Sequence, residues 1–424
     1  MAEKIKTVII GAGARGNVYV RQARPGDLEI VGVAEPHEGR RNYIKETYGL
    51  SDDVCFESYE ELFERDRFAD LAIIATNDRM HVDPAEKAMK KGYHILLEKP
   101  ISPVPEEVYR IGQLAEKYDK VFSICHVLRY TSFVKTLKKL LDDGAIGDLV
   151  SIVHNENVGY WHMAHSFVRG NWRNSDETSP MILAKCCHDM DLLLYLIGSD
   201  CKKVSSFGSL VHFKEENKPE GAPKRCVEGC PVYDTCQFNA VKLYTQSQLR
   251  NWIPRIFNLD EVTDENIIAA LYENPYGRCV YQCDNNVVDH QVVNLEFKNN
   301  VTVAFTMCAF TKNNERVFRF MGTRGEIEAY MEKNEIILKD FVTGNINKIE
   351  VSRSVSGHGG GDSSIMGTLV DAIRGKGEDK SSAVVSVQSH MMAFAAEKSR
   401  LENRVIDLDE YVSQVAEKAK QAFK

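Results

Sequence analysis

Three glycines near the start of the chain have the spacing that suits contact with a dinucleotide. The pattern Gly-x-Gly-x-x-Gly begins at residue 11 and directly follows an apolar, β-branched run, residues 7–10. It allows the backbone to turn tightly, to approach a pyrophosphate and to begin a helix whose N-terminus faces the phosphates. A second apolar run, residues 28–34, is followed by Glu35. A carboxylate at this position binds the adenosine ribose hydroxyls. The cofactor contacts expected from this pattern are Gly11, Gly13, Ala14, Arg15, Gly16 and Glu35.

The charge of Glu35 also bears on the choice of nucleotide. A carboxylate at this position binds both ribose hydroxyls of NAD and repels the 2′-phosphate of NADP. Arg40 and Arg41 lie on the next segment and could bind that phosphate, which would allow NADP. We expect NAD, because the carboxylate at the strand end is the more direct contact and both arginines can lie solvated on a helix.

Two further residues have side chains that could act on a substrate beside the nicotinamide. Lys99 follows an apolar strand pattern, and near a cationic ring its pKa would fall, so that it could donate to or polarise a substrate oxygen. His188 is the expected base, because imidazole titrates near neutral pH and could take a hydroxyl proton as hydride leaves the same carbon. Lys185, three residues earlier, could share its helix face and add a second cation. The alternatives are a surface lysine at a strand end and a capping or core histidine.

An aromatic and basic stretch, residues 160–173, has the composition of a pocket for a polyol. Indole and phenol rings stack on the apolar faces of sugars, while arginine, histidine and asparagine bind hydroxyls. A packed loop over a sheet would have a similar composition. The substrate-binding candidates are His165, Arg169 and Trp172 from this stretch, His290 at a strand start, and His358 in a glycine-rich loop.

Five of the eleven cysteines are grouped as metal ligands often are. They lie in an insertion, about 214–286, that is polar at first and shows little core-forming pattern, so a bound metal would explain its order. Four thiolates suit zinc or an iron-sulfur cluster, and the spacing does not separate the two. Free thiols, or disulfides formed on oxidation, are the other interpretation. The five residues are Cys226, Cys230, Cys236, Cys279 and Cys283.

The elements that must position these residues divide the chain in two. Up to residue 127, apolar strands alternate with helices, which indicates a doubly wound parallel sheet. The helices are expected at 17–24, 40–48, 84–91 and 106–118, and the later strands at 70–76, 93–97 and 121–125. From residue 128 to 424, longer alternating strands at 149–153, 204–213, 287–297 and 301–309 indicate a large, mostly antiparallel open sheet. The predicted fold is therefore an α/β Rossmann domain, 1–127, followed by an α+β domain, 128–424, whose C-terminal helices pack back.

Length and composition agree with such an enzyme-sized, two-domain protein. The chain has 424 residues, of which 43% are hydrophobic, and a net charge of −8 without long basic runs. Nucleic acid is therefore not an expected partner. The charged start and the absence of a run of eighteen apolar residues lead us to expect a soluble, cytoplasmic protein.

Further motifs, spread over nearly the whole chain, resemble those of one family. They are the glycine triplet, Ala75-Thr76-Asn77 followed by His81, Glu98-Lys99-Pro100, His126 to Tyr130, Gly144 to Gly147, and Gly322 to Glu326. By these motifs the chain resembles the glucose-fructose oxidoreductase / inositol dehydrogenase (Gfo/Idh/MocA) family.

The resemblance implies several roles. Lys99 would point into the active site beside the nicotinamide, the bond before Pro100 would be cis, and hydride would be transferred at a sugar or cyclitol carbon. His188 and Asp191 match the family pattern, although Ala184 stands where many members carry an aspartate partner for the histidine. A homo-dimer or tetramer, paired through the open sheets, is implied as well. The implied cofactor contacts add Thr76, Asn77, His81, Glu98, Lys99 and Pro100.

Three functions remain open from the sequence. The first is an NAD-dependent dehydrogenase of a sugar, cyclitol or sugar derivative. The second is a redox-neutral enzyme that oxidises its substrate transiently, eliminates a glycosidic group and returns the hydride. The third is a non-catalytic nucleotide or redox sensor.

Overall fold

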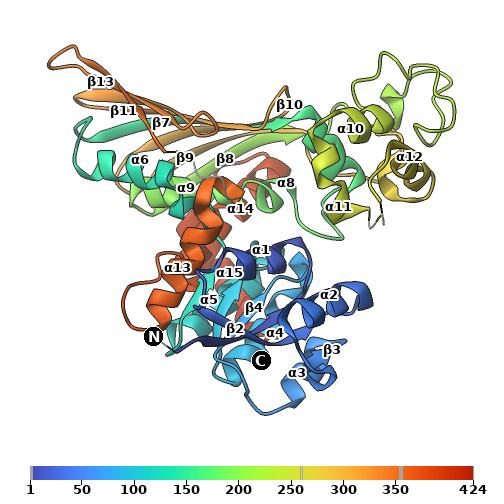
Figure 1. Cartoon of the computed structure of the whole chain (residues 1–424). Helices are drawn as coiled ribbons and strands as arrows, with labels where there is room; N and C mark the ends of the chain where they lie inside the picture. Colours follow the sequence, from blue (N-terminus) through green and yellow to red (C-terminus); the bar gives the residue numbers. More distant parts are fainter. Residues whose placement is uncertain (1–2, 258, 260, 353–356, 424) are drawn as a thin grey trace.

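Two sheets of opposite character organise the molecule (Figure 1). The computed structural model describes residues 3–257, 259, 261–352 and 357–423. The first sheet is parallel and the second is mixed and mostly antiparallel, as the alternation of the sequence predicts.

The first sheet has six parallel strands in the order β3-β2-β1-β4-β5-β6. They are β1 (Ile5–Ile10), β2 (Leu28–Ala34), β3 (Cys55–Phe56), β4 (Leu71–Ile74), β5 (His94–Leu97) and β6 (Phe122–Ile124). Helices cover both faces, and the central strands are therefore continuously apolar and buried. The helices are α1 (Ala14–Gln22), α2 (Glu38–Tyr48), α3 (Tyr59–Glu64), α4 (Val82–Lys90) and α5 (Pro105–Glu116). The strand order reverses between β1 and β4, so a crevice for a ligand is expected at the carboxyl ends of these strands.

The second sheet has nine strands in the order β14-β13-β12-β11-β7-β10-β9-β8-β15. Its central pair, β7 (Leu149–Gly159) and β10 (Thr302–Thr311), is parallel, and the other pairs are antiparallel. The first predicted strand, 149–153, thus continues to Gly159. The remaining strands are β8 (Cys201–Ser209), β9 (His290–Phe297), β11 (Glu315–Gly322), β12 (Gly325–Tyr330), β13 (Glu335–Asp340), β14 (Ile346–Glu350) and β15 (Ile406–Asp407).

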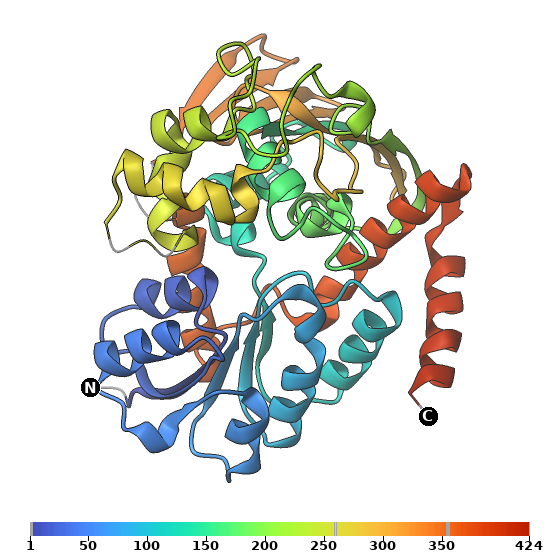
Figure 2. The same cartoon turned by 90° about the vertical axis from the view of Figure 1, so that its right-hand side faces the viewer.

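Helices α6 (Ser132–Asp142), α9 (Cys187–Ile197) and α14 (Ala383–Glu402) lie on the side of the second sheet that faces the first (Figures 1 and 2). In the described part of the chain, no helix lies over the opposite face of that sheet. The end of the chain returns to the first sheet, where α13 (Gly361–Ile373) contacts α1. Both α14 and α15 (Leu408–Ala422) contact α5, so the last three helices bridge the two halves.

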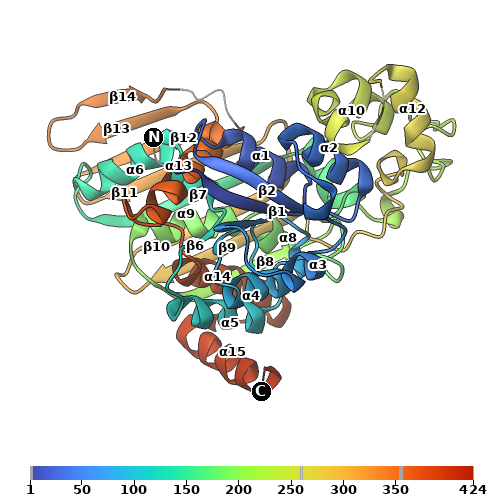
Figure 3. The same ribbon diagram turned by 60° about the horizontal axis from the view of Figure 1, so that its bottom comes forward.

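The insertion between β8 and β9 contains more structure than the sequence analysis allowed. It forms α10 (Ala240–Gln246), α11 (Ile253–Ile256) and α12 (Asp264–Glu273), which lie beyond the end of the sheet opposite β13 and β14 (Figure 3). Tyr244 and Leu271 are buried between these helices. The expectation of little core was therefore wrong, because apolar residues at helical spacing follow the polar segment that begins the insertion.

No helix within the described ranges is both long enough and apolar enough to cross a membrane. Even the 20-residue α14 carries charged side chains along its last turns.

Candidate functional site

The glycine loop after β1 leaves room for a phosphate group. Gly11 has a φ of 87°, and a Cβ on it would lie 2.6 Å from the Ala75 carbonyl oxygen. A Cβ on Gly16 would lie 2.3 Å from the Gly11 oxygen, so close packing requires both glycines. A Cβ on Gly13, by contrast, would meet no atom within 4 Å. Gly13 and the start of α1 line a hollow of about 250 Å³, so the loop fits a bound pyrophosphate.

Glu35 is fixed beside this hollow. It is 4% exposed, and its carboxylate accepts hydrogen bonds from the backbone N–H groups of Ala12 (2.8 Å) and His37 (3.0 Å). Arg40 lines the hollow, whereas the Arg41 guanidinium donates to the Glu35 carbonyl oxygen at 2.7 Å. Of the two arginines, only Arg40 faces the space where an adenosine ribose is expected.

A second hollow, also of about 250 Å³, lies between the two halves of the chain. One wall comes from α1 and the carboxyl ends of β4, β5 and β6, and the other from the segment 162–172 and the start of α9. The expected site residues that line it are Arg15, Thr76, Glu98, Lys99, Trp172, Lys185, His188 and His358. The sequence analysis did not single out Asp78, His162, Ser166 and Phe167, which also line it.

Lys99 is held at the floor of this pocket. The Lys99-Pro100 bond is cis, as the resemblance implies, and the Lys99 Nζ donates to the Ala184 carbonyl oxygen at 3.0 Å. The backbone carbonyl thus contacts the lysine at the position where relatives were expected to carry an aspartate. Glu98 accepts from Arg15 Nε at 2.6 Å. Burial alone would raise the pKa of Glu98, but Arg15 and Lys99 hold it below its usual value.

His188 meets Lys99 in the same pocket. It is 8% exposed, and among the described residues its Nδ1 has no hydrogen-bond partner. Burial, followed by the charge of Lys99, lowers the pKa of His188 well below its ordinary value. The imidazole is therefore neutral at neutral pH and can accept a proton.

A buried ion network fixes Lys185 in the pocket wall. Its Nζ lies 3.0 Å from a Glu156 carboxylate oxygen, and the other oxygen of Glu156 lies 2.9 Å from Arg316. Arg316 also binds Asp189 at 2.8 Å, and Asp189 contacts His154 at 2.8 Å. Because β7, β11 and α9 all contribute, the second sheet positions this lysine.

Several expected substrate contacts lie outside the pocket. Asp191 is buried in a bidentate ion pair with Arg129, with both distances 2.6 Å. His290 is half exposed at the start of β9, where it contacts Asp289. Both side chains have partners in the second half of the chain, and their contact with a substrate stays a prediction.

His165 and Arg169 do not line this pocket either. They lie on the π-helix Met163–Arg169, whose Ser166 and Phe167 face the pocket, while His165 stacks on Tyr276 at 4.7 Å. Burial lowers the pKa of His165 to about 3. The composition of the stretch indicated a pocket, but the sequence did not show which face of a π-helix would line it.

Two expected cofactor residues do not line the pocket directly. The His81 ring bridges the Pro100 and Thr76 carbonyl oxygens, at 2.6 and 3.1 Å, and so braces the loops on either side. Asn77 is exposed at the N-terminal end of a short 3-10 helix. Direct contact of either side chain with the cofactor stays a prediction.

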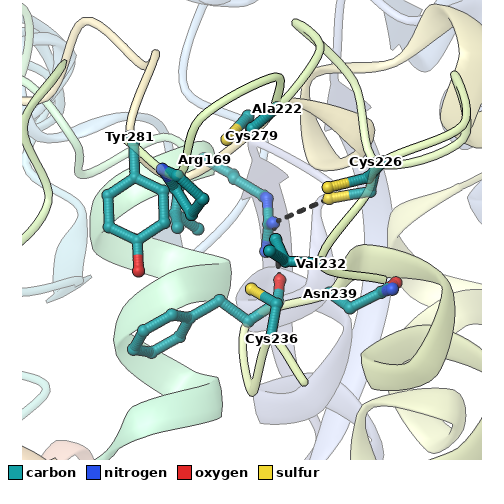
Figure 4. A pocket seen from close by; sticks show the side chains of 12 residues that line it. Arg169, Ala222, Cys226, Val232, Cys236, Asn239, Cys279 and Tyr281 are labelled. Carbon is teal, nitrogen blue, oxygen red and sulfur yellow. Dashed lines mark hydrogen bonds between the residues drawn. The ribbon is translucent and has the colours of Figure 1, made fainter. Parts of the chain in front are cut away.

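The cysteines of the insertion separate into two groups. Four of them, Cys226, Cys230, Cys236 and Cys279, line one cavity together with Arg169 (Figure 4). Cys283 instead donates its S–H to the Cys279 carbonyl oxygen and lines a neighbouring hollow. Among the described residues, no three histidine, cysteine, aspartate or glutamate side chains are grouped so as to hold a single metal ion. The structure thus places four of the five expected ligands at one cavity and Cys283 beside it.

Known proteins share this architecture. Relatives include the putative oxidoreductase YteT of Bacillus subtilis (strain 168), which is 22% identical over 341 residues, 73% of this chain and 77% of YteT. The 2,7-anhydro-N-acetylneuraminate hydratase of Escherichia coli (strain K12) is 26% identical over 238 residues, 56% of this chain and 59% of the relative. This chain thus spans a little over half the length of the latter.

Two solved structures show the same fold at low identity. A levoglucosan dehydrogenase in complex with NADH and L-sorbose is 17% identical, has a TM-score of 0.70, and is matched over 96% of this chain and 99% of that chain. An oxidoreductase from Agrobacterium radiobacter in complex with NAD⁺, L-tartaric acid and magnesium is 15% identical, with the same TM-score and the same coverage.

Two family models match the two halves in turn. Residues 5–126 match the NAD-binding Rossmann fold of an oxidoreductase family, and residues 138–408 match the C-terminal alpha/beta domain of the same family. Since these matches account for most of the chain, it belongs to the Gfo/Idh/MocA family of NAD-binding oxidoreductases.

Proposed function

We propose that the protein is an NAD-dependent dehydrogenase that oxidises a hydroxyl-bearing carbon of a sugar, cyclitol or sugar derivative. The observation that carries this proposal is the convergence of Lys99 and a neutral His188 on one pocket, at the carboxyl ends of β4 and β5. The open hollow at Gly13 adjoins the same strand ends and suits the cofactor.

The cofactor fits residues that are present. Gly13 and the N-terminus of α1 would hold the pyrophosphate, and Glu35 would bind the adenosine ribose. NAD, when bound, accepts a hydride from the substrate carbon. NADP is the less favoured nucleotide, because the Glu35 carboxylate would repel its 2′-phosphate.

The chain's own residues supply the proton chemistry. The hydroxyl proton passes to the neutral imidazole of His188, while the C–H hydrogen leaves as hydride and a carbonyl forms. The Lys99 ammonium donates to the substrate oxygen as negative charge develops on it. Lys185, held by Glu156, adds a second positive charge near the reacting carbon.

The substrate class rests on the rest of the pocket wall. The indole of Trp172 offers a face for a sugar ring, and His162 and Ser166 offer hydrogen bonds to hydroxyls. Names of relatives agree with this class: one is a glucose-6-phosphate 3-dehydrogenase of Bacillus subtilis (strain 168), 28% identical over 200 residues. A levoglucosan dehydrogenase structure contains NADH and levoglucosan.

The test is a turnover assay with the purified protein, NAD, and a panel of free sugars, cyclitols, sugar phosphates and aryl glycosides. Nicotinamide absorbance and aglycone release are followed together. NADH formation with a free sugar or cyclitol supports the proposal. NAD binding without turnover of any panel member contradicts it and favours the sensor function.

A redox-neutral reaction is the second candidate. It is favoured by relatives named 2,7-anhydro-N-acetylneuraminate hydratase, since a hydratase adds or removes water without net oxidation. In this cycle the hydride returns to the substrate after a group has been eliminated next to the transient carbonyl. Product formation without NADH, together with solvent deuterium incorporated next to the oxidised carbon, would identify it.

Self-association forms part of the same proposal. The face of the second sheet that no described helix covers exposes Val153 and Phe207 (40% and 61%). Sedimentation velocity of the native protein should show a dimer or tetramer, and Phe207→Lys should weaken it. A monomer at micromolar concentration would contradict this part.

A further inference from the structure

Two segments of the insertion are joined so that their cysteines meet. The backbone N–H of Cys226 donates to the Gly277 carbonyl oxygen at 2.9 Å, and that of Cys279 donates to Lys224 at 2.8 Å. The loop 226–236 then returns to the same place with Cys230 and Cys236. Four thiols from segments some fifty positions apart therefore line one largely apolar cavity with Ala222 and Val232 (Figure 4).

A buried guanidinium reaches into this cavity. Arg169 is 1% exposed; its Nε donates to the Arg278 carbonyl oxygen at 2.7 Å and its Nη2 to Phe238 at 2.8 Å. The same Nη2 lies 3.6 Å from the Cys226 sulfur. Within the described ranges, Nη1 has no hydrogen-bond partner and Arg169 forms no ion pair with a carboxylate.

An isolated buried cation is costly, by several kcal/mol in real proteins. Neutral thiols cannot offset that charge. A metal held by four thiolates can, because the thiolates outweigh the charge of a zinc ion or of an iron-sulfur core and leave the centre anionic.

We propose that Cys226, Cys230, Cys236 and Cys279 bind an anionic metal-thiolate centre, either zinc or an iron-sulfur cluster, and that Arg169 is its buried counter-charge. Among the described residues no three of these side chains are grouped to hold a single ion, so the thiols would have to move together on binding the metal. The site is distinct from the nicotinamide pocket.

The location of Arg169 gives this centre a defined structural task. Arg169 ends the π-helix whose Ser166 and Phe167 line the nicotinamide pocket. Anchoring the guanidinium to a rigid centre fixes one end of that helix. The centre would then help to position the wall that contacts the substrate, without taking part in the hydride transfer.

The first experiment is an analysis of metal content on the full-length protein purified without oxygen. Zinc, iron and acid-labile sulfide are measured per chain, and the visible absorption spectrum is recorded. One zinc per chain, or iron and sulfide in equal amounts with a charge-transfer absorption band, supports the proposal and identifies the centre. Neither metal in stoichiometric amount, before or after incubation with zinc or with ferrous iron plus sulfide, overturns it.

Matched variants locate the ligands. Cys236→Ser should lose most of the metal, while Cys283→Ser, outside the cavity, should keep it. NAD binding and circular dichroism report whether each variant is folded. Equal metal content in both variants would overturn the assignment of ligands.

A measurement on the unaltered protein covers the case in which Cys236→Ser does not fold. Thiol alkylation is mapped by mass spectrometry before and after a chelator removes the metal. The four cavity cysteines should become at least about tenfold more reactive after chelation, and Cys283 should change little. Unchanged reactivity at all five positions, or disulfides among them, would contradict the proposal.

Discussion

Buried arginines lie near both the nicotinamide pocket and the cysteine-lined cavity, but the groups that pair with them differ. Around the pocket, Arg129 pairs with Asp191, and Arg316 pairs with Asp189 and Glu156. In the cavity, Arg169 has only carbonyl oxygens and a thiol. The arginines around the first region are thus paired with carboxylates, whereas in the described part of the second region Arg169 has no carboxylate partner.

This difference shows that a buried arginine without a carboxylate partner can point to a binding site. Buried charges in proteins are normally paired, so an arginine without a carboxylate indicates a partner from outside the chain. Cysteine spacing alone left three interpretations open. The unpaired guanidinium favours a bound metal over free thiols, and the metal analysis proposed above separates zinc from an iron-sulfur cluster.

The largest expected effect belongs to the pocket. Lys99→Ala should lower kcat by about 10²- to 10⁴-fold, because the donor to the substrate oxygen is lost. NAD affinity, measured by fluorescence titration, should change little. Lys139→Ala, at a side chain that is 74% exposed, is the control. Turnover that survives in Lys99→Ala would place the chemistry elsewhere.

The second prediction compares the two kinds of buried arginine directly. Arg129→Met should lower the free energy of unfolding by about 3–5 kcal/mol, since it removes the bidentate partner of the buried Asp191 carboxyl group. Arg169→Met in chelator-treated protein leaves no carboxylate unpaired and removes an unpaired buried charge, so we expect a loss of at most about 1–2 kcal/mol, from its hydrogen bonds. Urea denaturation measures both. Equal losses would remove the distinction between the regions.

The third prediction concerns pH and the buried histidines beside the pocket. Burial lowers the pKa of His390 to about 3, so between pH 6.5 and 3 the unfolded chain binds a proton that the folded chain does not. The unfolding free energy should therefore fall on acidification, by about 1.4 kcal/mol per pH unit for this residue. His390→Gln should flatten the profile below pH 6.5. Parallel profiles for His390→Gln and the unaltered protein would refute this.

The smallest effect is expected at the glycine loop. Gly13→Ala should weaken NAD binding by about tenfold, roughly 1.4 kcal/mol, because its methyl group enters the space intended for the pyrophosphate. Stability should be unchanged, since nothing lies within 4 Å. Gly367→Ala, with similar free space on α13, is the control. Unaltered NAD affinity in Gly13→Ala would mean that the pyrophosphate lies elsewhere.

Sequence reasoning reached the fold and the centre of the site because both depend on local patterns. Strand and helix periodicity predicted the two sheets, and the glycine loop, Lys99 and His188 follow individual strands or begin helices. The sequence did not predict which residues of a segment face the pocket when that depends on how the segment turns. His165 and Arg169 share a stretch with Ser166 and Phe167, yet only the π-helix decides which pair faces the pocket.

Asp191 shows a second reason why part of the site could not be predicted from the sequence. A motif can place a carboxylate near a catalytic histidine in sequence, but its partner, Arg129, lies 62 positions away along the chain. Only the packing of α9 against the segment after β6 brings the two together. The helical core of the insertion was missed for a related reason, since its helices bury their apolar faces mainly against one another.

The π-helix Met163–Arg169 serves the pocket with one face and the cysteine cavity with the other. A change of residue type there alters one contact, whereas the loss of a single residue would rotate everything beyond it about the helix axis. Such a deletion would turn Arg169 away from the thiols and disturb the pocket wall at once. The number of residues in this segment is thus under a stricter constraint than the identity of most of them.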